Sequence, residues 1–255
     1  MKIRLLGTGY GECKTRKRNS MDFRRSGGAL VDEKILIDAP IDIFDVADEL
    51  GFADMFSEVT DIVISHSHPS HFSVEALLRL SERRKIRVYA TDVVLKLIPD
   101  TDKIEKIKLY VSFPAVIDGK YTLYSLPANH CTEISGEVCM NFVISSDKAL
   151  LYALDGGGIG YRAWSILSSL KINTCILDCA LADSDATYAL TYHNNLDSAR
   201  LTKDILIGSG ICEPNAKFVL SHIPTDKKRS IHCELTEKAT EVGMTVAYDG
   251  YFWSV

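Results

Sequence analysis

Three histidines in six residues, His66, His68 and His71, directly follow the apolar run 61–65. The whole chain has seven histidines, so this density belongs to one place rather than to the general composition. Neutral imidazole is the commonest metal ligand among side chains. The run before the cluster is short and rich in β-branched residues, which predicts a buried strand. These residues therefore predict a metal site on a loop held by a rigid strand.

Three more residues that can bind metals also follow apolar, strand-like runs, namely His130, Asp155 and His222. Three glycines come directly after Asp155, and their backbone permits close approach to a bound ion or ligand. Because each of these side chains stands at the end of a strand, one edge of a β-sandwich could gather all of them. That shared placement predicts a single site more strongly than the number of histidines does.

The elements that must position these residues are short and numerous. Apolar or alternating runs predict strands over 2–6, 28–31, 34–38, 61–65, 86–90, 107–111, 121–126, 139–145, 149–154, 174–178, 217–221 and 244–248. Helical spacing occurs over 42–50, 74–84, 161–170, 195–207 and 233–242. Ser73 is placed to cap the second of these helices, and Asn194 or Asn195 to cap the fourth. Many strands interleaved with fewer helices predict two sheets with helices outside, in one domain over residues 1–255.

The composition is that of an ordinary globular protein, with 46% hydrophobic and 25% charged residues. The longest apolar runs are too short to span a bilayer, and residues 1–7 lack the pattern of a signal peptide. Seven cysteines without a Cys-x-x-Cys pair predict reduced thiols. We therefore expect a cytoplasmic location and no membrane partner.

The net charge of −5 argues against a general nucleic-acid-binding protein, whose surface is basic. A local exception is a group of basic residues near the N-terminus, Lys14, Arg16, Lys17, Arg18, Arg24 and Arg25. Two interpretations of this basic group remain open. It could form a solvated loop, or it could present a positive edge that helps to dock a phosphorylated substrate.

The potential ligands stand in the order His66-Ser67-His68-Pro69-Ser70-His71, then His130, Asp155 and His222. This pattern resembles the metallo-β-lactamase superfamily, whose signature is His-x-His-x-Asp-His followed by a distant His, Asp and His. Further matches are the segments around Gly7, Asp38, Asp178 and Asp249. The set looks most like the branch that contains the phosphoribosyl cyclic phosphate phosphodiesterase of phosphonate breakdown. The transfer-RNA 3′-processing endonuclease is a more distant relative.

The resemblance implies an α/β (α+β) fold, an αββα metallo-β-lactamase sandwich of two mixed β-sheets with helices on the outer faces. The implied ligands are His66, His68 and His130 for one metal ion, His71 and His222 for a second, and Asp155 as a bridge between both. Such donors suit Zn²⁺, Mn²⁺ or Fe²⁺. Two ions would clamp a phosphodiester and activate the water that attacks phosphorus. This places Asp155 among the catalytic residues as well as among the ligands.

Position 70 departs from the resemblance, because Ser70 stands where the superfamily carries an acid that binds the second ion. A neutral hydroxyl is a poor ligand and a poor base at neutral pH. The second ion would keep three protein ligands, so we expect weaker occupancy. Two outcomes follow from the sequence. Either hydrolysis persists with an altered metal preference, or the protein binds its ligand without turning it over.

His193 lies just before the predicted helix 195–207, in a loop where the resembling branch has a histidine that faces the substrate phosphate. It is therefore predicted to bind phosphate or to act as the general acid for the leaving alcohol. The alternative is an ordinary loop histidine. Asp38 is predicted to support the site through hydrogen bonds, and His232 to stand outside it.

The leading hypothesis is a metal-dependent hydrolase, a phosphodiesterase that acts on a small phosphorylated substrate, with a cyclic phosphate among the options. An RNA-processing nuclease is the first alternative, and the acidic balance of the chain argues against it. A metal-binding sensor or scaffold, impaired by Ser70, is the second. The oligomeric state stays open, with a homodimer as one option.

Overall fold

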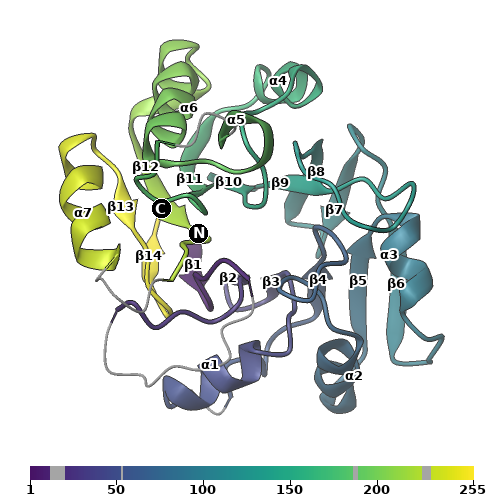
Figure 1. The fold of residues 1–255 in the computed structure, drawn as a ribbon. Helices are drawn as coiled ribbons and strands as arrows, with labels where there is room; N and C mark the ends of the chain where they lie inside the picture. The colour runs from purple at the N-terminus through teal and green to yellow at the C-terminus, as the bar shows by residue number, and fades with distance from the viewer. Residues whose placement is uncertain (12–20, 53, 186–188, 226–230) are drawn as a thin grey trace.

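The computed structural model describes residues 1–11, 21–52, 54–185, 189–225 and 231–255, and Figure 1 shows their arrangement. The strands form two seven-stranded sheets. The first has the order β14-β1-β2-β3-β4-β5-β6. Its strands span Phe252–Ser254 (β14), Lys2–Leu5 (β1), Ala29–Val31 (β2), Ile35–Ile37 (β3), Asp61–Val63 (β4), Ile86–Ala90 (β5) and Ile104–Lys108 (β6). Strands β3 to β6 are parallel neighbours, whereas β14 to β3 pair antiparallel.

The second sheet has the order β13-β12-β11-β10-β9-β8-β7. Its strands span Thr245–Val246 (β13), Cys212–Ser221 (β12), Ile172–Asp178 (β11), Ala149–Ala153 (β10), Met140–Ser145 (β9), Tyr121–Pro127 (β8) and Pro114–Ile117 (β7). Strands β10 to β13 are parallel, and β7 to β10 are antiparallel. Both sheets are therefore mixed, as predicted.

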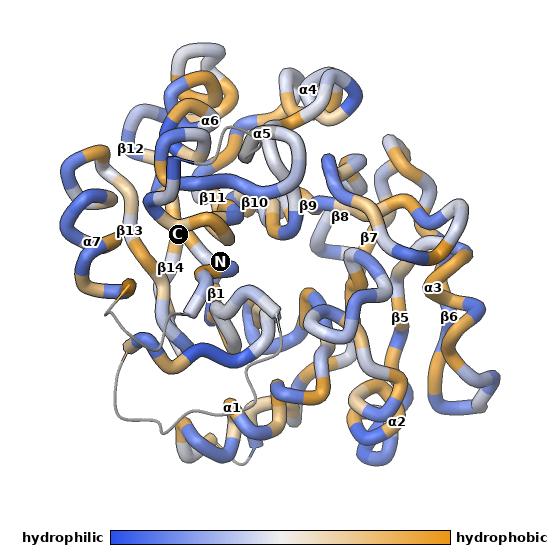
Figure 2. Tube along the Cα trace, viewed as in Figure 1, coloured by the Kyte–Doolittle hydropathy of each residue, from blue (hydrophilic) through white to orange (hydrophobic). Residues whose placement is uncertain are grey.

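The side chains along each strand point alternately to its two faces, and this creates three apolar layers. In β3, Ile35 and Ile37 join the cluster between the two sheets, while Leu36 joins the cluster on the outer face. Successive strand residues point to opposite faces, so a strand that is apolar throughout can feed two cores. Figure 2 shows the hydrophobic colouring continuing along neighbouring strands. The central core holds both sheets together, with Phe142 of β9 and Leu5 of β1 in the same cluster.

Helices cover the outer faces of both sheets (Figure 1). Three helices pack on the first sheet, α1 (Ile43–Glu49), α2 (Val74–Arg83) and α3 (Asp92–Leu97). Three helices pack on the second, α4 (Tyr161–Leu167), α6 (Leu196–Gly208) and α7 (Ile231–Glu241). A short helix, α5 (Ala189–Tyr192), precedes α6. This arrangement confirms the predicted αββα sandwich.

The predicted helix caps are confirmed. The Ser73 side chain accepts a hydrogen bond from the backbone N–H of Ala76 at 3.2 Å. Asn195 caps α6, where its side chain accepts from the Ser198 backbone N–H at 2.9 Å and the Ser198 hydroxyl accepts from the Asn195 backbone N–H. Such a reciprocal pair satisfies backbone donors that the first helical turn leaves unpaired. It also fixes the entry to α6, directly after the loop that carries His193.

The prediction misplaced or omitted several short elements. The strand predicted over 107–111 lies at 104–108, and β7, β14, α3 and α5 were not predicted. Each omitted element spans three to six residues, which is too short for a hydrophobic period to stand out. The strands β7 and β14 also lie at sheet edges, where pairing depends on backbone bonds to one neighbour.

Cysteines and membrane-spanning potential were also predicted from the sequence. The six described cysteines are free, which agrees with reduced thiols, and Cys13 lies outside the described residues. Among the described helices none combines the length and apolar character that crossing a membrane requires.

Candidate metal centre

The candidate ligands lie at one edge of the sandwich, beyond the carboxyl ends of several strands. His66 follows β4, His130 follows β8, Asp155 follows β10 and His222 follows β12. Strands β10 and β12 run parallel to β11, so their carboxyl ends reach the same edge. Open sheets with parallel strands place ligands at this kind of edge. The fold therefore gathers residues that are up to about 150 positions apart in the chain.

Three of the site residues have an unusual backbone. Asp38, Asp155 and His222 have φ values of 59°, 50° and 59°, in the left-handed region that non-glycine residues rarely adopt. Each of them follows a strand within two residues. A backbone held in this region costs about 1–3 kcal/mol and concentrates at functional sites. The turn lets the chain leave the sheet while the side chain stays at the strand end.

One half of the centre consists of His66, His68 and His130, together with Asp155. His66 Nε2 lies 3.0 Å from His68 Nδ1 and 3.1 Å from Asp155 Oδ2, and His130 Nε2 lies 3.3 Å from His68 Nδ1. Ligands about 2.0–2.1 Å from a tetrahedral Zn²⁺ lie roughly 3.3 Å from one another. The facing atoms of these four side chains thus have the spacing of a ligand shell.

The other half consists of His71 and His222, on the far side of the same carboxylate. His71 Nε2 lies 2.6 Å from Asp155 Oδ2, and His222 Nε2 contacts Asp155 Oδ1. Asp155 therefore stands between both halves, one oxygen towards His66 and His71 and the other towards His222. This is the placement that a bridging ligand needs. Ser70 lines the cavity that Asp155 and His222 also line, but it offers a hydroxyl in place of a carboxylate.

Buried polar atoms that face one another without a well-formed hydrogen bond mark the centre as a place built for a ligand. Among the described residues, His71 Nε2, His222 Nε2 and Asp155 Oδ1 are buried and lie in close contact, but none of them makes a hydrogen bond of normal geometry. Buried polar groups are nearly always satisfied in folded proteins, and an exception calls for a missing ion or ligand. Imidazole and carboxylate are donors for Zn²⁺, Mn²⁺ and Fe²⁺. The residues present therefore fit divalent metal ions.

The two halves differ in their protonation. Burial lowers the pKa of His66, and the nearby His71 lowers it further. Burial likewise lowers the pKa of His130 to about 3. For His71, burial also acts to lower the pKa, but the Asp155 and Asp38 carboxylates outweigh it and raise the pKa to about 10. Neutral imidazole is the form that binds metal, so His66 and His130 are already in that form at neutral pH.

Asp38 supports His71 as predicted. Its Oδ2 accepts a hydrogen bond from His71 Nδ1 at 2.8 Å and from the Tyr152 hydroxyl at 3.2 Å. Its Oδ1 accepts from the Ser65 backbone N–H at 2.8 Å, directly before the histidine cluster. With Nδ1 held in this way, His71 turns Nε2 towards Asp155. A carboxylate that orients a metal-binding histidine is the usual partner in such centres.

Several solved structures share this architecture over the whole chain. The metallo-β-lactamase fold protein YhfI from Bacillus subtilis matches with a TM-score of 0.73 and 16% identity, covering 99% of this chain and 98% of that one. A diphosphatase from the PhnP family matches at 0.71 and 17%, covering 100% and 97%. Zn²⁺-bound PqqB from Methylobacterium extorquens matches at 0.74 and 15%, covering 100% of both chains. The chain has the metallo-β-lactamase fold.

The metallo-β-lactamase fold does not by itself define a substrate. The short form of human tRNase Z also matches, with a TM-score of 0.69 and 14% identity over 100% of this chain and 99% of that one. No family model and no curated protein matches the sequence. Sequence identities this low establish a shared fold, and the chemistry has to be argued from the residues of this chain.

His193 enters the centre from the second sheet of the metallo-β-lactamase fold. Its Nδ1 donates to Asp178 Oδ2 at 2.9 Å and lies 3.8 Å from Asp155 Oδ1. Burial lowers the pKa of His193, but the hydrogen bond and charge of Asp178 outweigh it and raise the pKa overall. Asp178 Oδ1 accepts from the backbone N–H groups of Ala180 and Asn194. Both oxygens of the Asp178 carboxylate therefore accept hydrogen bonds, and these bonds hold His193 and the loop that carries it.

A second possible metal position also emerges from the geometry. Donor atoms of Asp155, Asp178, His193 and His222 all lie within 4.8 Å of one another. We favour a positioning role for Asp178, because both of its oxygens already accept hydrogen bonds and His193 directs Nδ1 at it. A histidine whose Nδ1–H is held by a carboxylate presents Nε2 to the cavity as a polar contact or proton donor.

A cavity of about 280 Å³ lies at the centre, and its lining residues are Tyr10, Gly11, His68, Pro69, Ser70, His130, Asp155, His193 and His222. The Tyr10 ring meets His193 and His222 edge-on, with centroid distances of 5.0 and 5.1 Å. Sequence reasoning missed Tyr10 and the role of Asp178. The sequence contains a signal for Asp178, because this acidic residue ends strand β11. Asp38 and Asp155 similarly come within two residues after the strands β3 and β10. The sequence contains no such signal for Tyr10.

All predicted ligands and His193 thus come together, and His232 lies apart, with Nδ1 beside Arg24 at 2.9 Å.

The basic group is only partly described, because Lys14, Arg16, Lys17 and Arg18 lie outside the described residues. Arg24 is fully buried and donates to Thr8 and to the Ala247 carbonyl oxygen, so it is neither a solvated loop residue nor an anion-facing edge. Arg25 is ion-paired with Asp45 and Glu49, at 3.2 and 2.6 Å. For these two arginines, both interpretations of the basic group, a solvated loop or an anion-facing edge, are therefore wrong.

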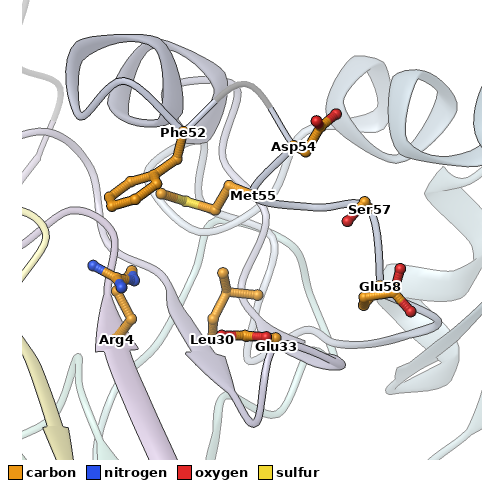
Figure 3. A pocket seen from close by; sticks show the side chains of 8 residues that line it. All are labelled: Arg4, Leu30, Glu33, Phe52, Asp54, Met55, Ser57 and Glu58. Atoms are coloured by element: carbon orange, nitrogen blue, oxygen red, sulfur yellow. The ribbon is translucent and has the colours of Figure 1, made fainter.

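Another cavity, of about 290 Å³, lies on the outer side of the first sheet, and Figure 3 shows its lining. Its walls combine apolar side chains such as Phe52 and Met55 with Glu33 and Glu58. Arg4 lies at one end with its guanidinium 4.9 Å from the centre of the Phe52 ring. None of its lining residues is a histidine, so it lacks the imidazole donors that gather in the histidine-lined cavity.

Proposed function

We propose that this chain is a metal-dependent phosphodiesterase that acts on a small phosphorylated substrate, with a cyclic phosphate on a sugar as one option. One observation carries the proposal. A cavity of about 280 Å³ is lined by the potential metal donors His68, His130, Asp155 and His222 and by His193, whose ring donates to Asp178. Metal donors alone would suit many hydrolases. An imidazole whose pKa is raised by a carboxylate favours its protonated form and so suits a substrate with negative charge.

Two divalent ions would be held in the two halves of the centre. His66, His68 and His130 would hold one, His71 and His222 the other, and Asp155 would contact both. Bound there, divalent ions lower the pKa of water and stabilise the charge that develops on a phosphate. Ser70 supplies no negative charge to the second half, so that half should bind its ion more weakly. Zinc, manganese and iron all remain compatible with these donors.

His193 would contact the phosphate and protonate the leaving alcohol. The hydrogen bond and charge of Asp178 raise the pKa of His193, which favours the protonated ring. Because Nδ1 donates to Asp178, the other ring nitrogen is available for a phosphate oxygen or the leaving oxygen. Tyr10 packs edge-on against this ring and restricts its rotation. A positioned general acid of this kind accelerates a reaction by about 10²–10⁴-fold.

The size of the cavity favours a small substrate. Pockets for small ligands occupy about 300–1,000 Å³, and this cavity lies near the lower limit. An RNA-processing nuclease needs a broad basic surface, which the net charge of −5 does not favour. The two described arginines of the basic group are also engaged inside the protein.

A metal-binding sensor or scaffold is the second candidate, and Ser70 is the observation that favours it. The Ser70 side chain lines the cavity at the motif position where an acid would complete the second half of the centre. A protein that binds one ion and a phosphorylated ligand without hydrolysing it would need no carboxylate there.

The test is hydrolysis of bis(p-nitrophenyl) phosphate by protein that has been stripped of metal and reloaded with Zn²⁺ or Mn²⁺. We expect turnover with at least one ion, loss of turnover in His66→Ala, and near-parental turnover in the control His232→Gln. Metal content per chain is measured on the same samples. Metal binding without any turnover would reject the phosphodiesterase and favour the sensor.

A further inference from the structure

An exposed loop connects His130 to β9, and it bears directly on half of the metal centre. Six of the eight residues from 131 to 138 are exposed, and only Thr132 and Glu137 are partly buried. Three hydrogen bonds stay inside the loop, from the Ile134 N–H to the Thr132 hydroxyl, from the Glu137 N–H to the Ile134 carbonyl oxygen and from the Thr132 hydroxyl to the Glu137 carboxylate. Contacts of this kind shape the loop but do not fix it to the rest of the protein.

The Glu137 carboxylate ties this loop to the histidine cluster. Its Oε1 accepts a hydrogen bond from the Ser67 backbone N–H at 2.8 Å. Its Oε2 accepts from the Ser67 hydroxyl at 2.6 Å and from the Thr132 hydroxyl at 2.6 Å. Ser67 lies between His66 and His68, and Thr132 lies two residues after His130. One carboxylate thus joins the two segments that supply three imidazoles.

His130 depends on such a tie more than its neighbours do. A histidine that binds metal usually donates its second ring nitrogen to a protein group, and this fixes the ring. The His66 ring has the Ser65 hydroxyl, at 2.9 Å from Nδ1. Among the described residues His130 Nδ1 is buried and makes no hydrogen bond. The ring of His130 is therefore placed by its backbone and by the rings of His68 and His193 beside it, and the Glu137 contacts join that backbone to Ser67.

The strength of these bonds is sufficient for this role. Hydrogen bonds to an ionised acceptor are roughly twice as strong as neutral ones. A metal-binding set has to be held within about 0.5 Å of its working geometry. The 3.3 Å separation of His130 Nε2 from His68 Nδ1 spans the two segments that Glu137 joins. The two segments are also linked by the Glu133–His68 ion pair at 3.4 Å and by the Met140 N–H bond to the Ser65 carbonyl oxygen at 3.1 Å, but neither of these contacts reaches Ser67 or Thr132.

We propose that Glu137 is a positioning residue for the half of the centre formed by His66, His68 and His130. It does not contact the ion or the substrate. It sets the distance between the His66–His68 segment and His130, and so sets the affinity of that half for a divalent ion. The inference rests on the metal-binding part of the proposed function and not on the identity of the substrate.

The experiment measures the affinity of the full chain for Zn²⁺ by competition with a chromophoric chelator. Loss of a supporting partner weakens metal binding by roughly 10–100-fold, and we expect a loss in that range for Glu137→Ala. Glu137→Gln should lose less, because its amide still reaches both hydroxyls. Co²⁺ loading gives an absorption spectrum that reports ligand geometry, and Glu137→Ala should alter it while leaving the far-ultraviolet circular dichroism of the metal-free protein unchanged.

Asp147→Asn is the control for the loss of one negative charge, because Asp147 is exposed and its carboxylate accepts from the neighbouring Ser146 hydroxyl. Glu133→Gln is a second support variant rather than a control, because the Glu133 carboxylate lies 3.4 Å from His68 Nε2. Equal losses in Asp147→Asn and Glu137→Ala would overturn the positioning role. Parental affinity and spectrum in Glu137→Ala would overturn it as well.

A double-mutant cycle keeps the inference testable if Glu137→Ala folds poorly. Thr132→Val removes only one of the three hydrogen bonds and should weaken Zn²⁺ binding by a smaller factor. In a Glu137→Gln background the same substitution should have less effect, because neighbours that act through one another are not additive. Full additivity would contradict the proposal. A parental chain that binds Zn²⁺ without hydrolysing a phosphodiester would reject the proposed function alone, and a chain that binds no divalent ion would reject both.

Discussion

The two halves of the metal centre share Asp155 but are built differently. The half around His66, His68 and His130 has facing donors at ligand-shell spacing and imidazoles whose pKa values are lowered. The half around His71 and His222 has a histidine held by two carboxylates, which raise its pKa, and Ser70 where an acid would stand. The first half is complete with neutral donors. The second is short of one anionic ligand, so the two halves should differ in affinity.

The largest effect is expected for a substitution of His66, which tests whether the first half of the centre is the stronger metal site. His66→Ala removes one imidazole and should abolish tight metal binding in the first half. The loss of activity should exceed the 10–100-fold that removing a supporting partner costs. Metal content and phosphodiester turnover measure it, and His232→Gln is the control. If activity survived in His66→Ala, the first half would not be the centre of the chemistry.

A large effect on chemistry rather than on metal affinity is expected for Asp178→Asn. A general acid must carry its proton, so activity falls as the pH rises through its pKa. Asp178 raises the pKa of His193, and removing its charge lets that pKa fall, so the alkaline limb of the pH–rate profile should move to lower pH. We expect kcat to drop by roughly 10²-fold at pH 8.

The control for this prediction is Asp197→Asn, a change of the same kind at an acid that is 86% exposed in the first turn of α6. Zinc content should stay at the parental value in both variants. An unchanged alkaline limb in Asp178→Asn would remove His193 from the role of general acid.

Ser70→Asp sharpens the comparison by restoring a carboxylate to the weaker half. We expect tighter binding of a second ion, by roughly 10-fold or more. A new charged contact that contributes about 1.4 kcal/mol of binding free energy raises the affinity tenfold. Titration with Mn²⁺ or Zn²⁺ and metal counts per chain measure it. A gain of activity would show an impaired but intact hydrolase. A second ion without activity would favour the sensor.

Tyr152→Phe should have the smallest effect. It removes one 3.2 Å hydrogen bond to Asp38, which keeps its bonds to Ser65 and His71. A hydrogen bond to a charged group contributes about 1.5–3 kcal/mol, and a long one less. We expect a loss of about 1 kcal/mol in unfolding free energy, measured by urea denaturation of the metal-free protein. A much larger loss would mean that Asp38 depends on Tyr152 more than its other partners suggest.

The sequence identified the candidate ligands and the type of fold. His66, His68 and His71 stood out as a cluster after one apolar strand, and His130, Asp155 and His222 as residues at the ends of other strands, because strand ends are readable from local patterns. The Ser73 cap and the position of α6 were readable for the same reason. The resemblance to a known superfamily implied how the candidate ligands would bind metal. Asp178 was readable in part, since it ends a strand in acid, but its partner His193 lies fifteen residues away on another element.

Only the tertiary structure decided the distances between those residues and what holds them. Which oxygen of Asp155 faces which histidine depends on the packing of two sheets whose strands are far apart in sequence. The burial of Arg24, the edge-on contacts of Tyr10 and the tie from Glu137 to Ser67 and Thr132 all span loops without periodicity. Local residue patterns report which side chains leave a strand end. Distances and pKa values depend on what lies across the cavity, and no local pattern contains that.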